Sequence, residues 1–169
     1  MNEEALRASI RSQYRAALAM LAQTIERCPA GLWTEGSRPS PYWRVAYHAL
    51  FYCHFYLQPT MADFRGWAKH RKDHQLLGDR LPFPPHTPIP PGEPYTPTEL
   101  LEYLEACRAE VDRLVPTLDL DAPSGFEWLP FGKLELQLYS IRHLMQHVGE
   151  LGERLNAEAG VEIDWVGRA

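Results

Sequence analysis

Residues 40–57 read SPYWRVAYHALFYCHFYL, and most of the architecture follows from how this stretch must fold. Ser40 followed by Pro41 is typical of a helix start, with a hydroxyl at the N-cap and proline at the first helical position. Pro59, just beyond the stretch, ends the helix. Almost every side of this helix is apolar, so the pattern predicts a helix that is buried on more than one side.

Three more helices follow from the spacing of apolar residues. Before this stretch, apolar residues recur every three or four positions between about residue 3 and residue 27. After it, Thr96 or Thr98 opens a third helix that Pro116 closes. A fourth helix runs from about residue 133 to residue 159. No stretch alternates convincingly as a half-buried strand does, so the sequence predicts an all-α fold, a four-helix bundle.

The connection between the second and third helices is long and rich in proline. Eight of the fifteen prolines fall between Pro82 and Pro97, where neither a helix nor a central strand can run. Loops of this length are uncommon in compact domains and are often functional, for example as a lid, although plain packing is an equal alternative. Residues 161–165 (VEIDW) form a tail that could dock on the bundle. We therefore expect a long Pro-rich crossover between helices two and three.

The composition of the 169 residues excludes several classes of protein. The 17 Lys and Arg residues against 22 Asp and Glu residues leave a formal charge of -5, and no basic patch marks a nucleic-acid partner. The longest strongly apolar stretch, residues 45–57, is too short for a membrane span, which needs roughly 20 residues. The N-terminus lacks the apolar segment of a secretory signal, and the three cysteines form no CxxC pair. We therefore expect one cytoplasmic domain over residues 1–169, with reduced thiols and with neither a nucleic-acid nor a membrane partner.

The clearest chemical signal lies in residues 141–151, IRHLMQHVGEL. His143 and His147 are one helical turn apart and about 40° apart on the helix wheel, so both imidazoles can reach one point. Helical zinc sites use this spacing. The pair lies on the border between the apolar arc and the solvent face, where it can still face the interior or an open cleft. Because two imidazoles hold a divalent ion weakly, a third ligand must come from elsewhere in the fold.

His48 is the preferred third ligand. It lies in the middle of the buried second helix, where a polar group is costly unless something satisfies it. His54 lies about 120° round the same helix, so at most one of the two faces the site. The alternatives stay open: His48 can be a hydrogen-bonded core histidine, and His143 and His147 can be two half-exposed histidines beside a polar face.

Other sites built from the same residue types rank lower. His70 and His74 have the same spacing, but they lie in the polar crossover beside two cations that oppose an added cation. Leu144 stands where the HExxH proteases carry their catalytic glutamate, and no glutamate precedes a histidine by three as a di-iron centre needs. Glu150 could complete a two-histidine, one-carboxylate iron site, but it serves more simply as a partner of a ligand or as a solvated charge. No GxSxG sequence or Gly-rich phosphate loop occurs, so no hydrolase elbow or nucleotide cofactor is predicted.

Residues 40–48 (SPYWRVAYH) and residues 143–151 (HLMQHVGEL) together resemble the DinB-like, or YfiT-like, superfamily of metalloenzymes. The resemblance implies a four-helix bundle in which His48, His143 and His147 bind a divalent metal, with zinc or nickel preferred and iron as an option. The family commonly has glutamine where this chain has Glu150, and this departure leaves the role of that position open. Members with assigned activity resemble thiol S-transferases or a thiol-dependent isomerase, and many members are homodimers.

The resulting hypothesis is a metal-dependent enzyme, a thiol S-transferase, whose three imidazoles leave one position open for a small-molecule thiol that attacks an electrophilic substrate. Arg44, Tyr52 and Tyr139 share helix faces with the ligands and could orient that substrate, but no catalytic residue is assigned. The alternative is a non-catalytic, dimeric metal-binding protein or a stress-related binding protein. A purely structural bundle is the third reading. A homodimer would suit the aromatic surface of the second helix.

Overall fold

The computed structural model describes residues 2–35 and 38–169. Over these two ranges the chain forms five α-helices and two short 3-10 helices but no β-strand, which confirms the predicted all-α class. Four helices are long: α1 (Glu3–Glu26), α3 (Tyr42–Leu57), α4 (Pro97–Leu114) and α5 (Lys133–Ala159). The fifth, α2 (Ala30–Trp33), is a single turn after α1. Within the described ranges, no helix is both long enough and apolar enough to cross a membrane.

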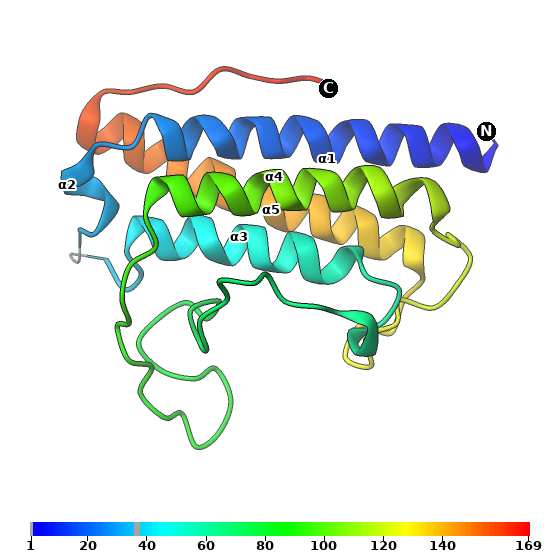
Figure 1. Ribbon diagram of the computed structural model, residues 1–169, viewed down its shortest axis with the longest axis horizontal. Coiled ribbons are helices and arrows are strands. Elements are labelled where there is room, and N and C mark those ends of the chain that lie inside the picture. Colours follow the sequence, from blue (N-terminus) through cyan, green and yellow to red (C-terminus); the bar gives the residue numbers. More distant parts are fainter. Residues whose placement is uncertain (1, 36–37) are drawn as a thin grey trace.

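The four long helices lie side by side (Figure 1). Both α1 and α3 contact α4 and α5 along their lengths, whereas α1 and α3 touch each other only slightly. The start of α3 meets the end of α5, because Arg154 of α5 donates a hydrogen bond to the carbonyl of Ser40 at 2.9 Å. These two helices therefore run in opposite directions, which brings the middle of α3 beside the middle of α5.

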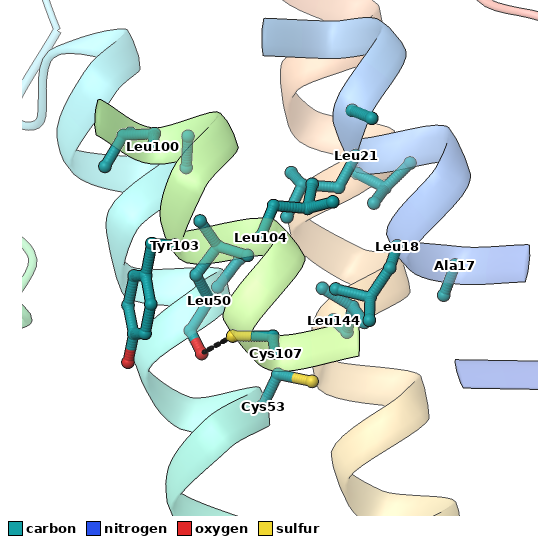
Figure 2. Close-up of a cluster of buried hydrophobic side chains, with 14 of the residues drawn as sticks. Ala17, Leu18, Leu21, Leu50, Cys53, Leu100, Tyr103, Leu104, Cys107 and Leu144 are labelled. Atoms are coloured by element: carbon teal, nitrogen blue, oxygen red, sulfur yellow. Dashed lines mark hydrogen bonds between the residues drawn. The ribbon is translucent and has the colours of Figure 1, made fainter. Parts of the chain in front are cut away.

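The apolar character of α3 is explained by its position, since thirteen of its sixteen residues are buried. One side of α3 packs into the shared core, where Figure 2 shows leucines from all four long helices: Leu18, Leu21, Leu50, Leu104 and Leu144. Burying one such side chain contributes about 1.5–3 kcal/mol. The opposite side is covered by the crossover, residues 58–96. The prediction that this helix is buried on more than one side is therefore confirmed.

The start of α3 differs from the prediction. Pro41 is the N-cap rather than the first helical residue, and no side chain caps the helix. The hydroxyl of Ser40 instead accepts a hydrogen bond from the backbone N–H of Gly78 at 2.8 Å. The cap assignment was wrong because the hydroxyl found a tertiary partner in the crossover. The start of α4 follows the rule, with Thr96 and Glu99 forming a reciprocal capping box.

The crossover contains one short helix, η1 (Met61–Asp63), and otherwise runs as turns and extended backbone alongside α3 (Figure 1). Side chains of α3 hold it by its carbonyl groups. The guanidinium of Arg44, only 3% exposed, donates to the carbonyls of Pro90, at 3.2 Å, and of Pro91. These carbonyls lie outside the helices, and the buried arginine, which can only donate, satisfies them.

The C-terminal residues 160–169 run in extended form beside α1 (Figure 1). The side-chain amide of Gln23 donates to the carbonyl of Asp164 at 3.1 Å and accepts from its N–H at 2.7 Å. Arg27 pairs with the carboxylate of Asp164 at 2.5 Å. The tail is thus docked on the helices, on the side of the molecule away from the crossover.

Candidate metal centre

Three histidine rings meet where α3 crosses α5. His48 comes from the middle of α3, and His143 and His147 come from successive turns of α5. The Nε2 atom of His143 lies 3.1 Å from Nε2 of His48 and 3.2 Å from Nε2 of His147. One ligand atom from each ring lies within 4.8 Å of the other two. The structure therefore brings together the three residues that the sequence proposed as ligands.

The three rings are largely withdrawn from water. His147 is 4% exposed, and His48 and His143 are half-buried. Burial, reinforced by the proximity of His147, lowers the pKa of His48 to about 3. The same two causes lower the pKa of His143 to about 4. At neutral pH these two imidazoles are uncharged, as metal ligands must be.

Acceptors outside the cluster determine which nitrogen of two rings faces it. Nδ1 of His48 lies 2.6 Å from the backbone carbonyl of Gln75, in the crossover. Nδ1 of His147 lies 3.1 Å from Oε2 of Glu150. Because both partners are acceptors, the uncharged form of either ring would carry its hydrogen on Nδ1 and turn an unprotonated Nε2 toward the shared point.

This arrangement fits a divalent cation. Zinc–nitrogen bonds of about 2.0–2.1 Å in a tetrahedral set place two ligand nitrogens roughly 3.3 Å apart, close to the observed 3.1 and 3.2 Å. Without a cation, His143 has at most one hydrogen on Nε2, which can satisfy only one of its two neighbours. A cation at the shared point would satisfy all three lone pairs at once. The donor set could therefore hold a metal ion.

Comparison with known protein families gives one match. A family model described as the DinB superfamily matches residues 5–151. The chain belongs to the DinB superfamily. The match spans most of the four long helices and includes all three histidines, which confirms the resemblance seen in the sequence. Neither the curated proteins nor the solved structures contain a match to this DinB chain.

The other histidines that the sequence raised lie outside the centre of this DinB protein. His54 turns toward α4, where its Nδ1 lies 3.1 Å from the hydroxyl of Tyr103. His70 contacts the hydroxyl of Tyr47 at 2.6 Å, and His74 contacts two backbone carbonyls of the crossover at 3.1 Å each. Among the described residues, the cluster of possible ligands contains the three histidines and no carboxylate or thiolate.

The residues expected beside the ligands divide into two groups. Tyr52 and Tyr139 form an aromatic wall of the centre: the Tyr52 ring lies 4.7 Å from that of His48, and the Tyr139 ring is stacked parallel to His143 at 6.5 Å. Arg44 instead holds the crossover, because its guanidinium donates to the carbonyls of Pro90 and Pro91. The two tyrosines could therefore contact a substrate, whereas Arg44 has a structural role.

Two supporting residues were missed in the sequence. Gln75 acts through its backbone carbonyl, which every residue type offers, so no sequence signal could have revealed it. Arg154 pairs with Glu150 and lies four residues after it on α5. That spacing is a readable signal, because residues four apart on a helix face each other.

Proposed function

We propose that this DinB protein binds one divalent metal ion through His48, His143 and His147, and that it uses the ion as an enzyme, in thiol-dependent S-transfer. The convergence of three Nε2 atoms from two helices supports the proposal most strongly. Zinc and nickel are the preferred ions, with iron as a third option, because neutral imidazoles suit all three.

An open coordination position favours an enzyme over a structural metal site. Structural zinc sites have four protein ligands, whereas catalytic sites have three and an open position. Glu150, the nearest carboxylate, faces Nδ1 of His147 on the outer side of the ring, and it is not among the atoms that converge. In the proposed site, a small molecule would take the fourth position.

When bound, the ion would act as a Lewis acid and would lower the pKa of a thiol toward neutral pH. The proposed reaction forms a bond between the thiol sulfur and an electrophilic carbon of the second substrate. The bond to the leaving group breaks, the leaving group takes its electron pair, and the thiol proton passes to solvent. Tyr52 and Tyr139 would pack against the apolar part of the substrate and exclude water from the reacting atoms.

The metal proposal is tested by calorimetric titration of metal-free protein with Zn²⁺ and Ni²⁺. We expect one ion per chain. We also expect that His48→Ala reduces the affinity for the metal ion at least about 100-fold, because only two of the three imidazole ligands remain. His54→Ala, on the same helix but facing α4, is the matched control and should bind as the wild type does. Binding that is absent in the wild type, or unchanged in His48→Ala, would refute the proposal.

A second candidate is a non-catalytic, dimeric metal-binding or stress-related binding protein, which the deep burial of His147 favours. Turnover separates the two candidates. The metal-loaded protein is assayed with a low-molecular-weight thiol and a panel of alkyl halides and epoxides. Thiol consumption that disappears on chelation supports the enzyme. Metal binding without any thiol consumption supports the second candidate.

The proposal also includes a homodimer that acts in the cytoplasm, where low-molecular-weight thiols and the free Cys53 and Cys107 stay reduced. The aromatic face of α3, which the sequence suggested as a dimer interface, is covered by the crossover of the same chain. Other exposed apolar side chains therefore support the dimer. Trp128, just before α5, is 52% exposed, and Leu138, near its start, is 58% exposed. Sedimentation equilibrium should give twice the chain mass of 19.4 kDa.

A further inference from the structure

Glu150 lies between a ring of the candidate metal centre and a buried arginine. One carboxylate oxygen, Oε2, is 3.1 Å from Nδ1 of His147, three residues earlier on α5. The other oxygen, Oε1, pairs with Nη2 of Arg154, four residues later. All three residues share one face of the helix, so the contacts follow directly from the helical repeat.

The carboxylate is held in place from the side opposite the histidine. The side chain of Arg154 is only 7% exposed, whereas that of Glu150 is 34% exposed. The second nitrogen of the guanidinium, Nη1, donates to the carbonyl of Ser40 at 2.9 Å, just before α3. Arg154 therefore prevents the carboxylate from turning toward solvent, and it joins the two helices that supply the three histidines.

The two neighbours of Glu150, Nδ1 of His147 and the guanidinium of Arg154, can both donate hydrogen bonds, so a carboxylate suits this position in this chain. The guanidinium can only donate, and a neutral His147 ring that presents Nε2 to the cluster must donate from Nδ1. An ionised carboxylate offers an acceptor to each donor. A glutamine offers one oxygen and one NH₂ group, so it would leave one of the two donors facing another donor.

From these contacts we infer that Glu150, held by Arg154, is a positioning residue that commits the His147 ring to the Nδ1–H tautomer and directs its Nε2 lone pair to the point shared with His48 and His143. The inference deepens the proposed function and relies on it for the role of that lone pair in metal binding. The tautomer itself is a property of the metal-free protein and can be measured without any ion.

The first test is the tautomer of His147 in metal-free, ¹⁵N-labelled protein at pH 8, read from long-range ¹H–¹⁵N correlations of the imidazole. We expect a protonated Nδ1 and an unprotonated Nε2 in the wild type. Glu150→Leu removes the acceptor and should lose this tautomer, and Glu150→Gln, which keeps the shape, should weaken it. Glu153→Gln alters an exposed glutamate on the same helix and is the matched control. An unchanged Nδ1–H tautomer in both Glu150 variants overturns the inference.

The second test is the affinity for Zn²⁺, measured by competition with a chromophoric chelator. Loss of the partner of a metal-bound histidine typically costs 10–100-fold in affinity, and we expect a loss of about that size for Glu150→Leu and a smaller one for Glu150→Gln. Glu153→Gln should stay within about twofold of the wild type, as a substitution that changes no partner of a ligand. If the wild type binds Zn²⁺ and both Glu150 variants bind equally well, the positioning role is refuted and the proposed function stands. If the wild type binds no Zn²⁺, the proposed function fails, and the tautomer measurement still decides whether Glu150 orients the ring.

Discussion

Two pairs of histidines in this chain have the same spacing, but one pair points to a shared position and the other pair has separate hydrogen-bond partners. On α5, His143 and His147 bring their Nε2 atoms to 3.2 Å and meet His48. In the crossover, His70 bonds to the hydroxyl of Tyr47, while His74 bonds to carbonyls of the crossover backbone. An i, i+4 spacing therefore predicts a shared ligand point only where the backbone between the two residues is helical.

The backbone of the crossover explains why the second pair does not converge. Residues four apart face the same way only when each residue turns the chain by about 100°. Asp73, directly before His74, has a φ of 64° and lies in the left-handed region, so the backbone between the two histidines is not a continuous right-handed helix. Each ring of this pair has its own hydrogen-bond partner, and these partners account for the two histidines without a metal.

The largest effect expected from this comparison is on metal affinity. His147→Ala should weaken Zn²⁺ binding at least about 100-fold, because one of three imidazoles is lost from the convergent set. His74→Ala removes the equivalent member of the other pair and should leave the affinity within about twofold, since it removes no ligand. Competition with a chromophoric chelator measures both variants. Equal losses in the two variants would show that the crossover pair also binds metal.

The next largest effect is thermal stabilisation by the ion. A ligand present at 100 times its dissociation constant stabilises the folded state by about 2.7 kcal/mol, which for a chain of this size raises the melting temperature by roughly 5–10 °C. We expect this shift with Zn²⁺ in the wild type and in His74→Ala, and its absence in His147→Ala. Differential scanning calorimetry with and without chelator measures it. If neither Zn²⁺ nor chelator changes the melting temperature of the wild type, the prediction is contradicted.

A smaller effect is expected from Gly92→Ala, which probes the packing around His74. A Cβ atom at Gly92 would lie 2.5 Å from Cε1 of the His74 ring, and the backbone there has a φ of 66°. Displacing a buried ring and straining the backbone should lower the free energy of unfolding by about 1–3 kcal/mol. Urea denaturation measures the loss, and Zn²⁺ affinity serves as the control, because it should not change. A parallel loss of affinity would indicate that the crossover conformation controls the metal centre.

The smallest effect is expected from His70→Phe. Phenylalanine can keep the stacking of this ring on Tyr47, which is 22° from parallel, but it cannot form the hydrogen bond with the Tyr47 hydroxyl. Loss of one such bond should cost about 1 kcal/mol in unfolding free energy. The same urea experiment measures it. A destabilisation of several kcal/mol would mean that His70 contributes more than this one bond.

Much of the fold was predictable because each long helix carries its own local signals. The apolar all-round pattern of residues 42–57 requires a buried helix, and Thr96 with Glu99 carries the capping box of the next helix. The start of α3 was misjudged because Ser40 has two possible partners, and the one chosen, Gly78, lies far along the chain. The path of the crossover was also beyond prediction, since contacts such as those of Arg44 with proline carbonyls are not encoded in any local pattern.

The candidate site likewise has one part that the sequence determines and another that only the tertiary structure determines. The pairing of His143 with His147 is a consequence of the helical repeat, so it can be calculated from two positions in the chain. That His48 joins them depends on the register of α3 against α5, which is set by the packing of many side chains and by end contacts such as that of Arg154 with Ser40. Local periodicity acts over one turn of helix and is written in adjacent residues. The meeting of distant segments arises only when the whole core closes. The sequence could propose His48 and Tyr52 for this place, but only the folded chain shows that they lie there, and the Gln75 carbonyl is found only in the structure.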